Sequence, residues 1–247
     1  MRAHAGVQVL RVLGHKMLVP YHRPEGPEGK SYPTVLFLHG FPGSEKSVDV
    51  QRALMKQGIA SVAPSFHGAW GSGGEYRFTT LVPQARAVLR AVRRLPFVDA
   101  KRMAAYGFSM GGWAALNLAA EDPSLKGVVA VAPAGGPEMI GPGNRAFLAH
   151  LAKSLNAPPI GALLSDFHRA LADFDPARAV TRARVPMLLI HGDGDLTIPV
   201  IVSRRLFALA GGRAKLIVEP GADHGFLESR EKLTRRAAAW LAARLGL

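Results

Sequence analysis

One serine lies in a setting that suits nucleophilic chemistry. Residues 107–111 read Gly-Phe-Ser-Met-Gly, with the serine at Ser109. A short apolar run at residues 103–106 precedes this pattern, and an apolar stretch typical of a helix follows it at residues 112–120. A serine on a tight turn from a strand to a helix projects its hydroxyl from the edge of a sheet, and flanking glycines relieve the crowding of that turn. The pattern predicts Ser109 as a nucleophile, with a simple turn serine as the alternative.

A base and an acid must accompany such a serine, because its hydroxyl attacks a carbonyl only when the base accepts its proton and the acid orients the base. In a parallel sheet these groups lie on loops after the carboxyl ends of strands. Two loops of this kind follow apolar runs downstream of Ser109, at residues 191–199 and 219–226. We expect His224 in the second loop to be the base and Asp195 in the first to be the acid, in the chain order Ser, Asp, His.

Neighbouring polar residues compete for these roles. Asp193 is an alternative to Asp195, but the spacing of four residues between Asp195 and Pro199 favours Asp195. Asp193 lies between two glycines and fits a turn. His224 itself has an alternative reading as a hydrogen-bonded loop histidine. We expect structural roles for His39 and His191, and we expect Asp223, which is adjacent to His224, to point away from it.

Four landmarks occur in order along the chain: Leu38-His39-Gly40-Phe41, the serine turn, His191-Gly192 with Asp195 and Pro199, and Gly221 with His224-Gly225-Phe226. With them the sequence resembles the α/β-hydrolase superfamily over nearly the whole chain from Thr34 onward. Residues 67–76 are similar to prolyl-oligopeptidase-type catalytic domains and related small esterases. Dienelactone hydrolases share this fold, but their typical members use a cysteine nucleophile, and this chain has no cysteine. The resemblance implies that the backbone N–H groups of Phe41 and Met110 form an oxyanion hole.

The rest of the chain alternates short apolar runs with helical stretches. Residues 7–13 and 16–21 predict a hairpin that turns near Gly14. Continuous apolar runs predict strands covered on both faces, at residues 34–38, 59–63, 103–106, 127–132, 186–190 and 214–218. Helices are expected at residues 45–57, 79–95, 112–120, 199–210 and 226–245. The alternation predicts one α/β domain over residues 1–247, with a doubly wound, mostly parallel sheet of about eight strands, as in the α/β-hydrolase fold.

The alternation stops between Pro133 and Arg184, where we expect no strand. Apolar residues recur there at helical spacing and predict two amphipathic helices. We interpret residues 134–183 as a small helical lid insertion, with ordinary core helices as the alternative. A substrate pocket is expected to be lined by side chains of this segment and of residues 67–70, namely His67, Trp70, Phe147, Leu151, Leu163 and Phe167. For His67 and Trp70, plain loop packing is an equal alternative.

The formal net charge of +13 raises the question of an anionic partner. Arg86, Arg90, Arg93 and Arg94 share one face of an expected helix. A solvated face is favoured over an acid-binding face, because no nucleic-acid motif or interleaved aromatic residue accompanies the charge, and we expect no nucleic-acid partner. No apolar stretch approaches the roughly 18 residues of a membrane span, and the N-terminus lacks a secretory pattern, so no membrane association and a cytoplasmic location are expected.

Neither a metal nor a cofactor is expected, because the histidines lack metal-ligand spacing and no phosphate-binding loop follows a strand. The residues and the resemblance together imply a serine hydrolase that cleaves small carboxylic esters through an acyl-enzyme intermediate. A peptidase of the acylaminoacyl or dipeptidyl type, acting on short peptides, is one alternative, although such enzymes usually carry a large propeller domain for which 247 residues leave no room. A catalytically silent binding protein of the same fold is the other. Both monomer and homodimer remain open.

Overall fold

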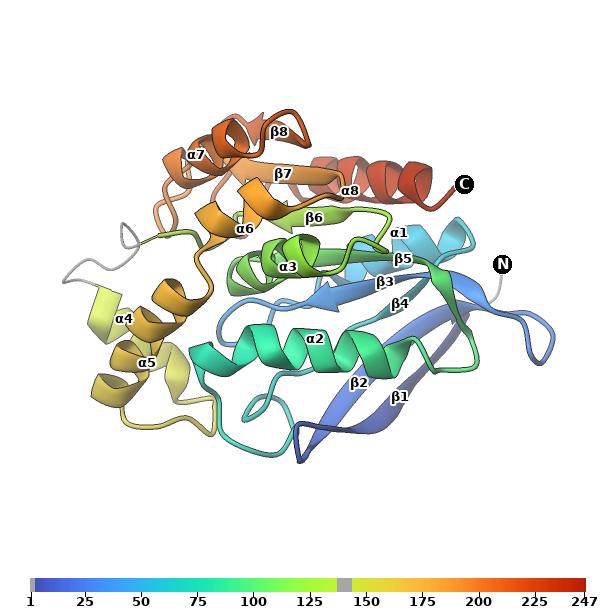
Figure 1. Ribbon diagram of the computed structural model, residues 1–247, viewed down its shortest axis with the longest axis horizontal. Coiled ribbons are helices and arrows are strands. Elements are labelled where there is room, and N and C mark those ends of the chain that lie inside the picture. Colours follow the sequence, from blue (N-terminus) through green and yellow to red (C-terminus); the bar gives the residue numbers. More distant parts are fainter. Residues whose placement is uncertain (1–2, 137–143) are drawn as a thin grey trace.

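A single sheet runs through the molecule, with the strand order β1-β2-β4-β3-β5-β6-β7-β8 (Figure 1). The computed structural model describes residues 3–136 and 144–247. The strands are β1 (Ala3–Val12), β2 (His15–Pro24), β3 (Tyr32–Leu38), β4 (Ala60–Val62), β5 (Val98–Phe108), β6 (Val128–Val131), β7 (Met187–Gly192) and β8 (Ala214–Glu219). The pairs β1–β2 and β2–β4 are antiparallel, and all other neighbours are parallel. The predicted fold class, a mostly parallel sheet of about eight strands, is confirmed.

Helices cover both faces of the sheet. They are α1 (Val48–Lys56), the 3₁₀ turn η1 (Phe78–Thr80), α2 (Leu81–Val92), α3 (Met110–Glu121), α4 (Asn144–Ala152), α5 (Ile160–Asp173), α6 (Pro176–Arg182), α7 (Ile201–Leu209) and α8 (Arg230–Arg244). Side chains of α2, α3, α6 and α7 belong to the core on one face, and those of α1 and α8 belong to the core on the other. Figure 1 shows these two helical layers with the sheet between them.

Strand β3 explains why the central strands read as unbroken apolar runs. Leu36 and Leu38 pack into the core beside α2 and α3, whereas Val35 and Phe37 pack into the core beside α1 and α8. Successive side chains of a strand point to opposite faces, so a strand covered on both faces needs apolar residues at every position. The parallel strands are thereby held in register, and their carboxyl ends meet along one edge of the sheet.

Two helices begin later than the sequence predicts, for the same physical reason. Helix α1 starts at Val48 instead of residue 45, because Ser47 has a left-handed backbone with φ 49°. Helix α8 starts at Arg230 instead of residue 226, because Phe226 has φ 57° and the residues after it form turns. A residue with positive φ cannot continue a right-handed helix, and this conformation is not visible in an apolar pattern.

Among its described residues, the segment between β6 and β7 holds three helices, α4, α5 and α6, where two were expected. The additional helix α6 is short, and the side chain of Asp175 caps it by accepting the N–H of Ala177 at 2.8 Å, with Pro176 in its first turn. Such a cap followed by proline is a start signal that periodicity alone overlooks. Helix α6 packs against α3 and covers the sheet. Residues 137–143 of the predicted insertion lie outside the described residues.

Acidic partners neutralise part of the arginine-rich face of α2. Arg86 forms an ion pair with Glu121, and Arg93 forms one with Asp122 at 2.8 Å. Arg90 on α2 and Arg94 in the turn after it are exposed. These two ion pairs join α2 to the end of α3, so two of the four arginines have a structural role. Within the described part of the chain, no helix is both long and apolar enough to cross a bilayer.

Candidate active site

Ser109 occupies the turn between β5 and α3. Its backbone has φ 53° and ψ −118°, a conformation that costs energy for any residue other than glycine and is found mainly at functional turns. The turn presses α3 against β3, because a Cβ atom added to Gly111 would lie 1.9 Å from the carbonyl oxygen of Leu38. Glycine at this position is therefore a steric requirement. The turn holds the Ser109 hydroxyl beside the N-terminus of α3, where backbone N–H groups are free of helical partners.

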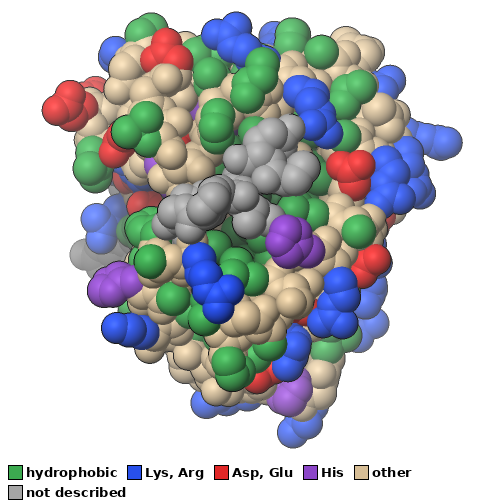
Figure 2. Space-filling view, turned by 90° about the vertical axis from the view of Figure 1, so that its left-hand side faces the viewer, with side chains coloured by type: hydrophobic (Ala, Val, Ile, Leu, Met, Phe, Trp, Pro, Cys, Tyr) green, Lys and Arg blue, Asp and Glu red, His purple; other side chains and the backbone are tan. Residues whose placement is uncertain are grey.

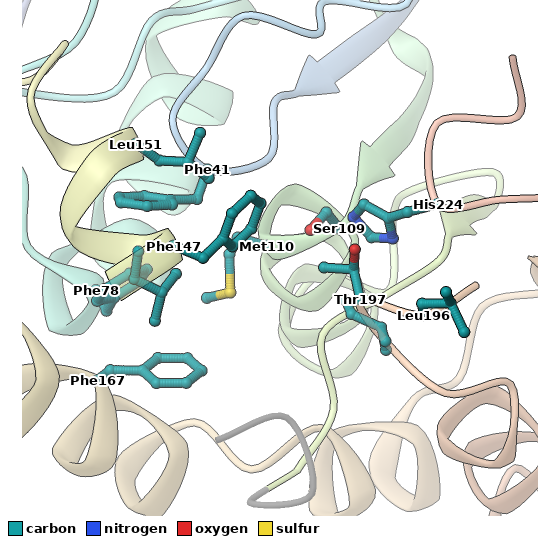
Figure 3. Close-up of a pocket in the computed structure, with 12 residues that line it drawn as sticks. Phe41, Phe78, Ser109, Met110, Phe147, Leu151, Phe167, Leu196, Thr197 and His224 are labelled. Carbon is teal, nitrogen blue, oxygen red and sulfur yellow. The ribbon is translucent and has the colours of Figure 1, made fainter. Parts of the chain in front are cut away.

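His224 and Asp195 are joined by a short hydrogen bond. The Nδ1–H of His224, in the loop after β8, donates to Oδ2 of Asp195, in the loop after β7, at 2.7 Å. Figure 3 shows Ser109 and the His224 ring next to each other, with one ring nitrogen on the side of Ser109, while the Ser109 oxygen points to the other side. Side chains from three distant loops are thus brought together, as general-base activation of a hydroxyl requires.

The carboxylate of Asp195 is buried and held by four hydrogen-bonding partners. Its Oδ1 accepts the backbone N–H groups of Thr197 and Ile198, each at 2.8 Å, and Nε2 of His191 lies 3.2 Å from Oδ2 beside the His224 bond. Burial by itself raises the pKa of Asp195, but the bonds from His191, His224 and the Ile198 N–H outweigh burial and hold the pKa below its usual value. The group is therefore an anion able to orient His224 and to stabilise its protonated form.

The other polar residues near the site are engaged in hydrogen bonds of their own. Nδ1 of His191 bonds to the hydroxyl of Ser203 at 2.7 Å, and its Nε2 bonds to the carbonyl of Ile198 at 2.8 Å. Asp223 accepts the N–H of Leu227 at 2.8 Å. The ring of His39 bonds to the carbonyl of Gly40 and to the N–H of Phe66, and burial lowers its pKa to about 3. Each of these groups is positioned by the loops around the site.

The loop after β3 approaches Ser109 closely. A Cβ atom on Gly40 would lie 2.9 Å from Cβ of Ser109, so the chain passes beside the serine with no room for a side chain. Phe41 follows in that loop, and Met110 is the first residue of α3. The N–H of a first helical residue has no acceptor within its own helix. The predicted N–H groups of Phe41 and Met110 thus belong to two backbone segments next to Ser109.

A cavity of about 290 Å³ opens beside Ser109 and His224. We call one part of it the aromatic chamber, which is formed by Phe41, Phe78, Met110, Phe147, Leu151 and Phe167. Leu196 and Thr197 line the part near His224, and Ile198 also belongs to the lining. Figure 2 shows hydrophobic side chains inside a hollow on the face of the molecule that includes α4 and α5. The cavity is mainly apolar and places a carbonyl group within reach of the serine.

Three of the expected pocket residues lie outside this cavity's lining. His67 is buried, and its ring lies edge-on to that of His15 at 5.1 Å. Trp70 is 52% exposed and donates its Nε1–H to the carbonyl of Pro42 at 3.2 Å. Leu163 lies on the buried side of α5 within the main core. Loop packing and core packing account for these three residues, whereas Phe147, Leu151 and Phe167 do line the cavity.

Sequence reasoning missed several lining residues. Phe78 precedes α2, and its ring lies 4.8 Å from that of Phe167. No periodic signal marks Phe78, because it belongs to a single 3₁₀ turn. The side chain of Phe41 also lines the cavity, although only its N–H was considered. Leu196 and Thr197 directly follow Asp195, and this adjacency was the one available signal for them.

Structural neighbours share the fold of this chain. A 2,6-dihydroxy-pseudo-oxynicotine hydrolase is similar with a TM-score of 0.80 and 22% identity, covering 98% of this chain and 68% of the other. Est1E from Butyrivibrio proteoclasticus has a TM-score of 0.76 and 19% identity, covering 98% and 100%. An esterase of Pyrococcus furiosus has a TM-score of 0.75 and 20% identity, covering 98% and 92%. At these identities the likeness is one of fold.

Curated relatives and a family model relate the sequence itself to known proteins. An uncharacterized protein of Mycobacterium tuberculosis is 26% identical over 197 residues, and the match covers 79% of this chain. An uncharacterized peptidase of Bacillus subtilis is 24% identical over 227 residues, which is 82% of this chain. The chain spans only 64% and 32% of the lengths of these two relatives. The model of the prolyl oligopeptidase family matches residues 46–247, most of the sequence. The chain therefore belongs to the prolyl oligopeptidase family, as its motifs indicated.

Proposed function

We propose that the protein is a serine hydrolase that cleaves carboxylic esters through an acyl-enzyme intermediate, with Ser109, His224 and Asp195 as its triad. The observation that carries the proposal is one cavity lined by both a strained serine and a histidine that is bonded to a buried carboxylate. Each group has the environment that its role needs. The serine is held at a turn, the histidine is partly exposed, and the carboxylate is kept ionised.

The proposed reaction has two steps. The Ser109 oxygen bonds to the ester carbonyl carbon while its proton passes to Nε2 of His224, and the oxyanion accepts hydrogen bonds from the N–H groups of Phe41 and Met110. The bond from this carbon to the alcohol oxygen then breaks, and the alcohol leaves with the proton from His224. In the second step water attacks the acyl-enzyme with His224 again as base, which releases the acid and restores Ser109.

Peptide hydrolysis is the second candidate, and the family match favours it. A peptidase that trims peptide ends needs a charged side chain to hold the terminal ammonium or carboxylate. Among the described residues, those lining the cavity include no Lys, Arg, Asp or Glu. An uncharged lining favours esters with apolar groups over peptide termini. Helices α4 and α5 contribute apolar side chains to this lining. We therefore propose that residues 134–183 are a lid inserted into a single domain.

A probe and a pair of variants test the proposal. A fluorophosphonate probe should label the wild-type protein at Ser109, and p-nitrophenyl butyrate should be hydrolysed faster than aminoacyl p-nitroanilides. Ser109→Ala should abolish both labelling and turnover while leaving the circular dichroism spectrum and melting temperature unchanged. Asp195→Asn should retain the fold and lower kcat by about 10⁴-fold, because the histidine loses its orienting acceptor.

The results separate the candidate functions. A clear preference for the anilides would replace the esterase assignment with a peptidase. A folded wild-type protein that neither labels nor turns over any substrate would establish a silent binding role. Undiminished turnover by Ser109→Ala would remove Ser109 from the mechanism.

A further inference from the structure

We propose that the aromatic chamber binds the acyl half of the ester, and that this acyl group is uncharged and has up to about ten non-hydrogen atoms. This inference rests on the proposed function and extends it to the substrate class. It also assigns two residues outside the cavity lining, Thr79 and Asp166, as positioning residues for the chamber.

The positions of Ser109 and His224 decide which half of the ester enters the chamber. After attack, the carbonyl carbon is bonded to Ser109, and His224 must reach the alcohol oxygen to protonate it. The alcohol therefore lies on the His224 side, and the acyl group extends to the opposite side. Figure 3 shows Phe147, Met110 and the rest of the aromatic chamber on that opposite side, with Ser109 between them and His224.

Two described residues on the His224 side of the cavity are exposed. Leu196 is 98% exposed there, and Thr197 is exposed beside it. An alcohol group on this side remains largely in water and makes few contacts that depend on its size. Selectivity for the alcohol should accordingly be weak, and selectivity for the acyl group should be strong.

The volume and lining of the cavity define the acyl group. The whole cavity of 290 Å³ holds about ten groups of water size, at about 30 Å³ each, so the chamber, which is one part of it, holds at most that number. Phenylacetyl and octanoyl groups meet this limit, whereas a palmitoyl group exceeds it. A charged acyl group would lose its hydration without finding a partner, because the described lining residues include no Lys, Arg, Asp or Glu.

Aromatic rings form a continuous wall of the chamber. The ring centroids of Phe41 and Phe78 are 5.4 Å apart, and those of Phe78 and Phe167 are 4.8 Å apart, all in tilted arrangements. Phe78 and Phe167 are almost fully buried. Such rings offer large apolar surfaces at fixed positions, which suits a flat aryl group or an extended chain.

A buried hydrogen-bonded pair holds two of these rings in place. The carboxylate of Asp166, on α5, is 1% exposed and accepts the hydroxyl of Thr79 at 2.7 Å and the N–H of Thr79 at 3.2 Å. Phe78 and Phe167 are the neighbours of these two residues in sequence. The pair thereby joins η1 to α5 at the point where both contribute a ring to the chamber. Its loss should widen the chamber without touching Ser109.

Two series of esters test the assignment of the halves. With p-nitrophenol as the constant alcohol, acyl groups from acetyl to palmitoyl should raise kcat/KM about threefold to fourfold per added methylene up to about octanoyl, and the value should fall beyond that length. Phenylacetyl should rank with octanoyl. With acetyl as the constant acyl group, p-nitrophenyl and 4-methylumbelliferyl esters, whose phenols differ in size but are similar in acidity, should differ by less than about threefold, since the phenols would lie in solvent.

Variants test the wall and the positioning pair. Phe167→Ala should lower the ratio of phenylacetate to acetate kcat/KM by about tenfold or more. Phe207→Ala, which removes a partly exposed ring of α7 outside the cavity lining, should leave the ratio unchanged. Thr79→Val should raise KM for phenylacetate while leaving both constants for acetate unchanged, and Thr79→Ser, which keeps the hydroxyl, should restore the wild-type KM. A merely structural role of Thr79 would instead change kcat for all esters alike.

The outcomes separate this inference from the function on which it rests. Fluorophosphonate labelling and turnover with no dependence on acyl length would overturn the inference alone. A strong dependence on the alcohol, with none on the acyl group, would reverse the two halves and overturn it as well. Absence of both labelling and turnover would overturn the proposed function and this inference with it.

Discussion

The buried imidazole of His39 ties the stability of the fold to pH. Its side chain is 2% exposed, and its two nitrogens bond to the carbonyl of Gly40 at 2.7 Å and to the N–H of Phe66 at 3.0 Å. These partners suit the neutral ring, in which one nitrogen donates and the other accepts. Burial, assisted by the nearby charge of Lys46, lowers the pKa from 6.5 to about 3. A second proton would place a donor against the Phe66 N–H.

The sign and size of the effect follow from linkage. Between pH 6.5 and pH 3 the unfolded chain binds a proton on His39 that the folded chain refuses, so stability falls as the pH is lowered through this window. The slope for one such group is about 1.4 kcal/mol per pH unit. Lowering the pH from 8 to 5 should therefore cost about 2 kcal/mol at this residue, or about 4–8 °C in melting temperature for a chain of this length.

Urea unfolding followed by circular dichroism between pH 8 and pH 5 measures this contribution. His39→Gln keeps a hydrogen-bond acceptor but cannot titrate. The variant should be less stable than the wild type at pH 8, but its free energy of unfolding should fall by about 2 kcal/mol less than that of the wild type when the pH is lowered to 5. His168→Gln, on the exposed side of α5, should retain the wild-type slope. If His39→Gln also retains that slope, the argument from burial of His39 is refuted.

Two further predictions concern packing and the joining of helices. Gly111→Ala should lower the free energy of unfolding by at least about 3 kcal/mol, because the added Cβ would lie 1.9 Å from the carbonyl oxygen of Leu38. Gly161→Ala on α5, where the nearest atom to an added Cβ is 4.0 Å away, should be neutral or stabilise the fold by up to about 1 kcal/mol. Thermal melts of both variants check this. Arg230→Met should lower the free energy of unfolding by about 2 kcal/mol, because Arg230 on α8 donates to both carboxylate oxygens of Asp49 on α1, at 2.7 and 2.8 Å. A free energy of unfolding equal to that of the wild type would contradict this prediction.

Local patterns were sufficient for the sheet and for the pairing of His224 with Asp195. A buried parallel strand leaves a continuous apolar run, so strands such as β3 and β7 could be located directly. The glycines around Ser109 and the spacing from Asp195 to Pro199 belong to single turns, whose geometry depends on a few adjacent residues. Loops at the carboxyl ends of parallel strands meet at one edge, and this rule was enough to choose His224 as the partner of Asp195.

The exact starts of helices and the membership of the cavity depended on contacts between distant segments. The positive φ angles of Ser47 and Phe226 are imposed by surrounding structure and leave no mark on hydrophobic periodicity. Leu163 and Phe167 lie one turn apart on α5, yet only Phe167 lines the cavity. Their spacing shows only that these two apolar residues lie close to one face of the helix. The packing of α5 against η1 decides which of them lines the cavity. That packing, with the Asp166–Thr79 bond at its centre, exists only in the folded chain.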